Sequence, residues 1–169
     1  MHDSVAKDLL FRLIHNIIPN RQRLFRMNKC SHQYCLEEVI EIEVQGPLNE
    51  GIAGRDGMKI LGGEVEDNTH LFAQCVKVGE CWHWLRSRIL DLLPLNSDNC
   101  SDWELLHLTF PEHIYEDTIL WLISSYCEIV WTNEKRGMTL TLKKMLYELK
   151  ERYWCHQRDQ RVQLTHINF

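Results

Sequence analysis

The pattern of hydrophobic and polar positions along the chain is mainly helical. Apolar residues at helical spacing predict an amphipathic helix over residues 4–18, which Pro19 ends, and then a short basic helix, Arg21–Met27. Further helices are predicted from Thr69 to Pro94, in a short segment that follows the capping-box pattern of Ser101 and runs to Leu108, over Glu112–Thr132, and over Met138–Thr165 after Gly137. No internal repeat is visible, so the predicted fold class is mainly α.

One stretch has the alternation typical of a β-strand. Residues 37–44, EEVIEIEV, alternate acidic with apolar side chains, and a glycine-rich stretch separates them from the short apolar segment Met58–Leu61. A two-stranded hairpin with a long, mobile tip fits this pattern, and an irregular insertion fits it nearly as well. We therefore predict a single domain over 1–169: N-terminal helices and a first cysteine pair in 1–35, an insertion in 36–63, a His/Cys half-site and helix in 64–94, and C-terminal helices in 95–169.

The predicted helices carry apolar stripes that would form the core. The predicted helix that ends at Pro94 has an apolar face made of Val78, Trp82, Leu85, Ile89 and Leu92. The last predicted helix directs Leu142, Met145, Leu146, Leu149 and Tyr153 inward. All six tryptophans lie in or beside predicted helices, where aromatic side chains are more often core residues than base-stacking platforms: Trp82, Trp84, Trp103, Trp121, Trp131 and Trp154.

Composition adds that the chain is an ordinary globular domain. Its 169 residues are 44% hydrophobic and 25% charged, which excludes collagen-like, low-complexity and wholly disordered proteins. The net charge of −5 argues against a protein that coats nucleic acid. However, residues 1–29 and 132–169 each carry a net +4, whereas residues 30–131 carry −13. The two basic ends could bind a phosphate backbone, or they could be the solvated faces of amphipathic helices.

The seven cysteines are better explained as thiols or metal ligands than as disulfides. No secretory signal pattern opens the sequence, and the longest apolar stretch, Ile119–Ser124, is far shorter than the roughly 20 residues of a membrane span. We therefore expect an intracellular protein, in the nucleus or cytoplasm, that is neither secreted nor bound to a membrane.

Three of the cysteines and one histidine suggest a zinc site, in the pattern Cys30-x4-Cys35 and His70-x4-Cys75. Three thiolates and one imidazole suit the closed tetrahedron of a structural zinc ion. His32, between the first two cysteines, could replace either of them as a ligand. Alternatively, the cysteines are small buried hydrophobes and His70 only begins a helix.

The same region resembles a known family. The matching segments are Pro19-Asn-Arg21-Gln-Arg23-Leu24, the cysteine pair, and Glu66-Asp-Asn-Thr-His70-Leu-Phe-Ala-Gln-Cys75, followed by Val78 and by Trp82 with Trp84. They are similar to the zinc-binding region C-terminal to the reverse transcriptase domain of non-LTR retrotransposons. The segment WLISSYCEIVW at 121–131 is similar to the tail of such polyproteins. The separation of Cys35 from His70 by 35 positions departs from the family pattern, in which only a short segment lies between them. Polymerase and endonuclease motifs are absent from these 169 residues.

The resemblance implies a non-catalytic, zinc-stabilised helical module that helps to hold RNA or DNA. Weak phosphate contacts are expected from four basic residues beside the zinc site, namely Arg21, Arg23, Arg26 and Lys29. The alternative is a helical protein-interaction domain with no metal and no nucleic-acid role. An enzyme is not expected, because the ligand set leaves no open coordination position, and neither a phosphate loop nor a catalytic triad stands out. No small-molecule substrate is expected.

Overall fold

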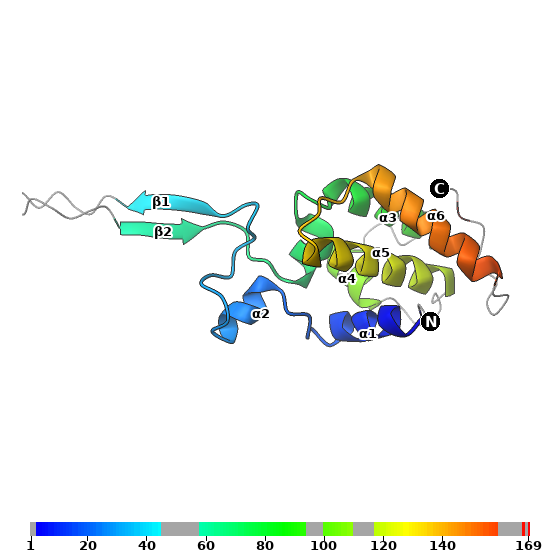
Figure 1. Ribbon diagram of the computed structural model, residues 1–169, viewed down its shortest axis with the longest axis horizontal. Helices are drawn as coiled ribbons and strands as arrows, with labels where there is room; N and C mark the ends of the chain where they lie inside the picture. The colour runs from blue at the N-terminus through cyan, green and yellow to red at the C-terminus, as the bar shows by residue number, and fades with distance from the viewer. Residues whose placement is uncertain (1–2, 45–57, 94–99, 110–116, 159–166, 168) are drawn as a thin grey trace, which may run out of the picture.

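The computed structural model describes residues 3–44, 58–93, 100–109, 117–158, 167 and 169, and it is mainly helical, as predicted. Figure 1 shows a body of helices from one side of which a two-stranded hairpin projects. The elements in chain order are α1 (Asp3–Ile14), α2 (Arg21–Arg26), β1 (Ile40–Val44), β2 (Met58–Gly62), the π-helical turn η1 (His70–Gln74), α3 (Gly79–Leu92), α4 (Asp102–His107), α5 (Asp117–Lys135) and α6 (Leu142–Arg158).

Helix α5 lies at the centre of the helical body. It packs against α1, α3 and α6, and it is the most apolar of the long helices. Its inner face includes Ile119, Leu122, Ile123, Tyr126 and Ile129, each no more than 1% exposed. Burial of so many large side chains makes hydrophobic packing the main source of stability of this body.

Two of the polar residues of α5 that face inward are paired with α6. The carboxylate of Glu128 accepts a hydrogen bond from Arg152 of α6. Asn133 donates to the carbonyl of Ile129 and accepts from Lys144 Nζ at 2.6 Å. Because buried polar groups are costly without partners, these contacts fix the register of α6 against α5.

Helix α1 ends earlier than residue 18, where the hydrophobic pattern placed its end. Asn16 adopts the left-handed conformation with φ 52°, and the amide of Ile17 donates to the carbonyl of Arg12 at 2.8 Å. This arrangement is a Schellman-type C-cap, in which asparagine substitutes for the usual glycine. The apolar residue Ile18 is nevertheless fully buried, so it enters the core from the turn rather than from the helix.

The predicted hairpin is confirmed for the paired strands. β1 and β2 are antiparallel, with Ile42 opposite Ile60, so these residues are not an irregular insertion. The predicted tip, residues 45–57, lies outside the described residues. Gly63, which follows β2, has φ 141°, and a Cβ there would lie 2.6 Å from the carbonyl oxygen of Glu38. Only glycine fits at this close approach of the two chain segments.

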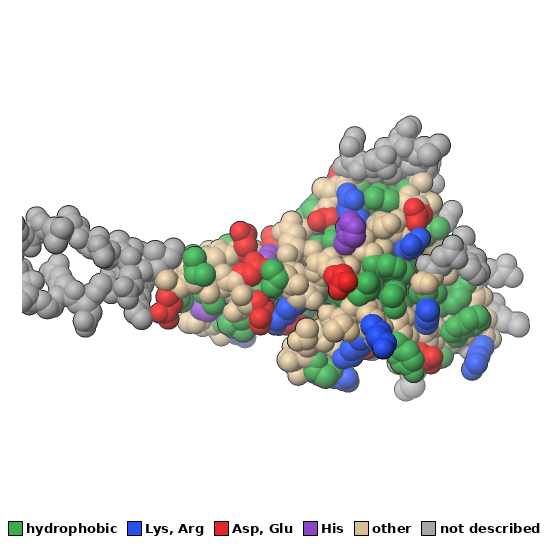
Figure 2. Space-filling model, turned by 90° about the horizontal axis from the view of Figure 1, so that it is seen from above, with side chains coloured by type: hydrophobic (Ala, Val, Ile, Leu, Met, Phe, Trp, Pro, Cys, Tyr) green, Lys and Arg blue, Asp and Glu red, His purple; other side chains and the backbone are tan. Residues whose placement is uncertain are grey.

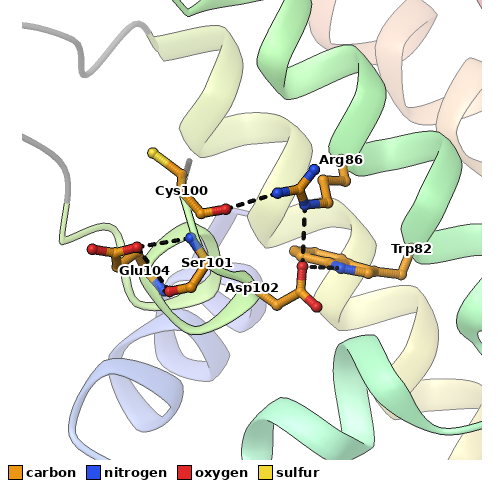
Figure 3. Close-up of polar contacts among 6 residues, drawn as sticks. All are labelled: Trp82, Arg86, Cys100, Ser101, Asp102 and Glu104. Carbon is orange, nitrogen blue, oxygen red and sulfur yellow. Dashed lines mark hydrogen bonds and ion pairs between the residues drawn. The ribbon is translucent and has the colours of Figure 1, made fainter. Parts of the chain in front are cut away.

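The capping box predicted at Ser101 is present and helps to attach α4 to α3. The Ser101 hydroxyl accepts from the Glu104 amide, and the Glu104 carboxylate accepts from the Ser101 amide. Asp102 accepts from Trp82 Nε1 at 2.8 Å and from Arg86 Nε at 3.2 Å (Figure 3). The N-terminus of α4 is thereby fixed against two successive turns of α3.

The last two helices differ from their predicted bounds. Gly137, with φ 61°, ends the α5 segment as predicted, but α6 begins at Leu142 rather than Met138 because the Thr141 hydroxyl caps it by accepting from the Lys144 amide. The predicted first residues of the α5 helix, up to 116, and the predicted last turns of α6, from 159, lie outside the described residues. None of the described helices is long and apolar enough to span a bilayer.

The tryptophans divide between core and surface. Trp82 is buried, and three others pack partly buried against the core, as predicted: Trp84, Trp121 and Trp131. Trp103 and Trp154 are 51% and 60% exposed, so for these two the prediction of a core position is wrong. Helical spacing alone does not distinguish a core stripe from an aromatic residue on the adjoining surface.

Candidate metal centre

The two halves of the predicted metal site meet at the base of the hairpin. The amide of Cys35 donates to the carbonyl of Glu64 at 2.9 Å, and the amide of Glu66 donates to the carbonyl of Gln33 at 3.0 Å. Tyr34 and Val65 form an isolated antiparallel bridge between these two bonds. The chain therefore leaves the site after Cys35, forms the hairpin, and returns beside its point of departure.

The π-helical turn η1 brings the second pair of donors together. Asp67 Oδ1 accepts from the His70 amide at 2.7 Å, and the Cys75 amide donates to the His70 carbonyl at 2.8 Å. This bond joins residues five positions apart and places Cys75 one wide turn after His70. The hydroxyl of Tyr126, from α5, donates to the carbonyl of Phe72 at 2.7 Å and attaches the turn to the core.

A network of three asparagines, two of them buried, holds the same segment against α1 and α2. The side chains of Asn20 and Asn68 are each 3% exposed and are joined by a 2.6 Å hydrogen bond. Asn68 also donates to Asn16 Oδ1 at 3.0 Å, and Asn20 caps α2 by accepting from the Arg23 amide. Each of these side-chain amides forms a hydrogen bond to a different segment of the chain, so the network fixes the position of Asn68, two residues before His70.

The side chains of Cys35, His70 and Cys75 form a compact, buried group that could hold a metal ion such as zinc. One donor atom from each lies within 4.8 Å of the other two, and the residues are 3%, 3% and 5% exposed. The two Sγ atoms are 3.7 Å apart. Two thiolates at about 2.3 Å from one tetrahedral zinc ion would be about 3.8 Å apart, so the sulfur atoms already have the required spacing.

The nitrogen Nε2 of His70 is the clearest sign of a missing partner. This atom is buried and accepts or donates no hydrogen bond. A buried polar atom without a partner costs about 1–3 kcal/mol. A cation between this nitrogen and the two sulfurs would satisfy it. A cavity of about 20 Å³, lined by Cys35, His70 and Cys75, provides room for one small ion or water molecule.

The electrostatic environment of the metal-free site keeps the thiol of Cys75 protonated. Burial, and to a smaller extent the neighbouring thiol of Cys35 and the carboxylate of Glu38, raise the pKa of Cys75 to about 12. Burial also raises the pKa of Glu66, although a hydrogen bond from the Arg21 amide acts in the opposite direction. A bound divalent cation reverses this preference, because it stabilises thiolate and carboxylate anions beside it.

Not all the predicted ligands meet. Cys35, His70 and Cys75 are brought together, whereas Cys30 lies outside their group, and its Sγ is 3.1 Å from the carbonyl oxygen of His32 and 3.5 Å from that of Arg21. The ring of His32, the alternative ligand, stacks against Tyr34 at a centroid distance of 6.1 Å.

The acidic residue Glu38, which the cysteine and histidine spacing does not indicate as a ligand, approaches the site instead. Its Oε2 is 3.7 Å from His70 Nε2. Its position three residues after Cys35 is the only signal in the sequence that could have drawn attention to it.

The four basic residues predicted to contact phosphate lie on α2 and the turn after it. Arg26 and Lys29 are exposed, Arg21 and Arg23 are partly buried, and α2 has no buried residue. The backbone amides of Arg21 and Gln22 donate to Glu66, which also lines the cavity beside the metal ligands. The basic helix is therefore positioned by the same segment that carries the site.

The surface around the base of the hairpin is acidic. Figure 2 shows Asp and Glu side chains gathered along it, whereas Lys and Arg are spread over the helical body among exposed hydrophobic side chains. The acidic residues at the base are Glu37, Glu38, Glu41, Glu64, Glu66 and Asp67. This distribution attracts cations to the site and weakens the attraction of the neighbouring α2 for a polyanion.

The fold and the site together define a mainly helical domain with a hairpin and a buried Cys2His group suited to a metal ion. In comparisons with family models, with curated proteins and with solved structures, no match to the chain was found.

Proposed function

We propose that this chain is a non-catalytic, zinc-stabilised helical module that contacts RNA or DNA weakly, as the resemblance to the C-terminal region of non-LTR retrotransposon reverse transcriptases implies. The observation that carries the metal proposal is the buried group of Cys35, His70 and Cys75, with its unpartnered imidazole nitrogen. Zinc at this point would tie three segments together: the base of the hairpin, the η1 turn and, through Glu66, the basic helix α2.

Zinc content and thermal stability test the metal proposal. We expect about one zinc per chain in the purified parent, and loss of it in His70→Ala and Cys75→Ser. Because 1 kcal/mol shifts Tm by about 2–4 °C in a domain of this size, loss of a structural zinc should lower Tm by well over 5 °C. Cys155→Ser is the matched control, since Cys155 is exposed on α6. A folded parent without zinc would contradict the proposal.

The nucleic-acid proposal depends on α2 and can be tested by charge removal. Arg26 and Lys29 are exposed near the site, and Lys143 and Lys150 are exposed on α6. If the first pair contacts phosphates, the double alanine variant at 26 and 29 should reduce the slope of log K against log salt by about 2, whereas the double variant at 143 and 150 should leave it unchanged. Equal effects of both variants would indicate non-specific attraction.

One observation favours the second candidate, a protein-interaction domain. Large apolar side chains are exposed along α1, α2 and the turns after them, namely Phe11, Ile14, Ile17, Phe25 and Met27. Exposed apolar patches often mark protein interfaces. Association that is independent of salt and requires these side chains, without any binding of RNA or DNA, would favour this candidate over the first.

A further inference from the structure

We propose that the fourth ligand of the metal is the carboxylate of Glu38, so that the site is Cys2HisGlu rather than the Cys3His set expected from the cysteine spacing. This inference rests on the proposed metal site and specifies its chemistry. A structural zinc ion takes four ligands, and the compact group provides three of them. The question is which side chain completes the tetrahedron.

The backbone fixes Glu38 at the edge of the group. Its amide donates to the carbonyl of Cys35 at 3.2 Å, which closes a tight turn directly after the first ligand. The carbonyl oxygen of Glu38 lies against Gly63, where any larger residue would collide with it. The turn after Cys35 is thus held from two sides, and its last residue faces η1 rather than solvent.

The side chain of Glu38 reaches across to the other two ligands. Its Oε1 accepts from the amide of Val76, the residue after Cys75, at 3.2 Å. Its Oε2 is 3.7 Å from the unpartnered Nε2 of His70, and the side chain is only 19% exposed. An imidazole nitrogen and a carboxylate oxygen that share one tetrahedral zinc ion at about 2.0–2.1 Å would be separated by about 3.4 Å. Glu38 lies outside the compact group of three, so ligation requires its side chain to move toward the two sulfur atoms.

The rival ligands are less well placed. Cys30 directs its sulfur toward the backbone carbonyls of Arg21 and His32, and the donor atoms of Cys30 and His32 are not part of the compact group. The imidazole Nδ1 of His32 is buried and has no partner, which makes His32 the rival that a test must include. Among the described residues, neither Cys30 nor His32 forms a hydrogen bond, ion pair or ring contact with a proposed metal ligand, whereas Glu38 contacts both the His70 ring and the segment after Cys75.

The number of thiolates separates the two ligand sets. Zn²⁺ with either set carries the same net charge of −1, so affinity for a divalent cation does not distinguish them. Co²⁺ occupies tetrahedral zinc sites and gives an absorption band for charge transfer from thiolate sulfur, whose intensity increases with the number of coordinated thiolates. A Cys2HisGlu site would show the intensity of two thiolates, and a Cys3His site that of three.

The experiment is a titration of the metal-free full chain with Co²⁺, followed by absorption. We expect one equivalent to bind the parent, Cys30→Ser and His32→Asn to keep the parent's charge-transfer intensity and affinity, and Cys35→Ser and Cys75→Ser each to lose about half of the intensity or all binding. Glu38→Gln should keep the charge-transfer band, change the ligand-field bands as water enters the fourth position, and weaken Co²⁺ binding at least about tenfold. Glu37→Gln is the matched control, since Glu37 is the adjacent residue and pairs with Lys77 instead.

Several results would overturn the assignment. If Cys30→Ser lost a third of the charge-transfer intensity, or if His32→Asn shifted the ligand-field bands, another residue would be the fourth ligand. If Glu38→Gln behaved like Glu37→Gln while the parent bound Co²⁺, Glu38 would not ligate, although the metal site itself would stand. If the parent bound no Co²⁺ or Zn²⁺, both the site and this ligand assignment would fail. Circular dichroism of the metal-free variants confirms that each is folded before titration.

Discussion

The hydroxyl group of Tyr126 connects the central helix to the turn that carries two of the proposed ligands, and its removal is a sensitive test of this connection. The hydroxyl donates to the carbonyl of Phe72 at 2.7 Å, across 54 positions of sequence, and both residues are 0% exposed. Tyr126→Phe removes this single oxygen and leaves the ring, which contacts Trp82 at a centroid distance of 5.8 Å, in place.

The expected cost follows from the carbonyl that loses its donor. A typical net hydrogen bond contributes about 0.5–1.5 kcal/mol, but a buried group left without a partner costs about 1–3 kcal/mol. Because the Phe72 carbonyl lies in the core, where water does not replace the hydroxyl, the second range applies. We therefore expect Tyr126→Phe to lower the free energy of unfolding by about 2 kcal/mol.

Urea unfolding followed by tryptophan fluorescence measures this difference. With a denaturant slope of about 2 kcal/mol/M, a loss of about 2 kcal/mol lowers the midpoint by about 1 M. Tyr147→Phe is the control, since Tyr147 is 66% exposed on α6 and its change should stay within about 0.5 kcal/mol. If Tyr126→Phe unfolded at the same urea concentration as Tyr147→Phe, the Phe72 carbonyl would have another donor, and Tyr126 would not support the turn.

Three further predictions concern buried polar groups and thiols. Asn68→Ala should lower the free energy of unfolding by about 2–3 kcal/mol in chemical denaturation, because two of its hydrogen-bond partners, the Asn20 side chain and the Leu13 carbonyl, remain buried, whereas exposed Gln74→Ala should have little effect. In metal-free protein, iodoacetamide followed by mass spectrometry should modify exposed Cys155 well before Cys127, whose pKa burial raises and whose side chain is inaccessible. Metal-free Glu66→Gln should be more stable than the parent at pH 7, because burial raises the pKa of this carboxyl above 4.5 and disfavours its ionised form.

The prediction for Glu66→Gln also implies a pH dependence of stability that can be measured. A raised pKa means that the folded state of the parent binds the Glu66 proton more tightly than the unfolded chain does. Stability of the parent therefore falls as pH rises from the ordinary pKa of the carboxyl to its raised value, and it is not recovered above that. The advantage of Glu66→Gln should disappear below about pH 4. An advantage that persists there, or a variant less stable at pH 7, would contradict burial as the dominant effect.

For the other two predictions, an Asn68→Ala variant as stable as Gln74→Ala, or equal labelling of Cys127 and Cys155, would be contrary results.

The sequence predicted the elements better than their ends. Hydrophobic spacing located the helical segments and the strand alternation located β1, because both periodicities report directly which side chains face a core. The end of α1 was missed because a left-handed asparagine, Asn16, closes the helix while the apolar pattern continues to Ile18. The start of α6 was missed for a similar reason, since the hydroxyl of Thr141 caps the helix only when the preceding chain turns as it does after Gly137.

Only part of the metal site was predictable from the sequence, because local backbone geometry brings two ligands together whereas a non-local contact adds the third. His70 and Cys75 are five positions apart, so local backbone geometry alone brings them together. Cys35 belongs to the group only because its segment pairs with Glu64 and Glu66, a contact that sequence spacing does not report. Glu38 was missed because carboxylates near a hairpin are ordinary surface residues until a fold turns one of them toward a buried imidazole.

The long separation of Cys35 from His70 is a weaker objection to a metal site than the spacing suggests. Each doubling of a flexible loop adds only about 0.6 kcal/mol to the entropic cost of closing it, so even three doublings add about 2 kcal/mol. Structural zinc supplies on the order of 10 kcal/mol of apparent binding free energy. In this chain the cost is lower still, because the antiparallel strands Ile40–Val44 and Met58–Gly62 and the backbone bonds at Cys35 and Glu66 hold the two ends of the insertion together independently of the ligand side chains. An insertion that folds as a hairpin projecting from the site therefore lengthens the sequence between ligands without moving them apart.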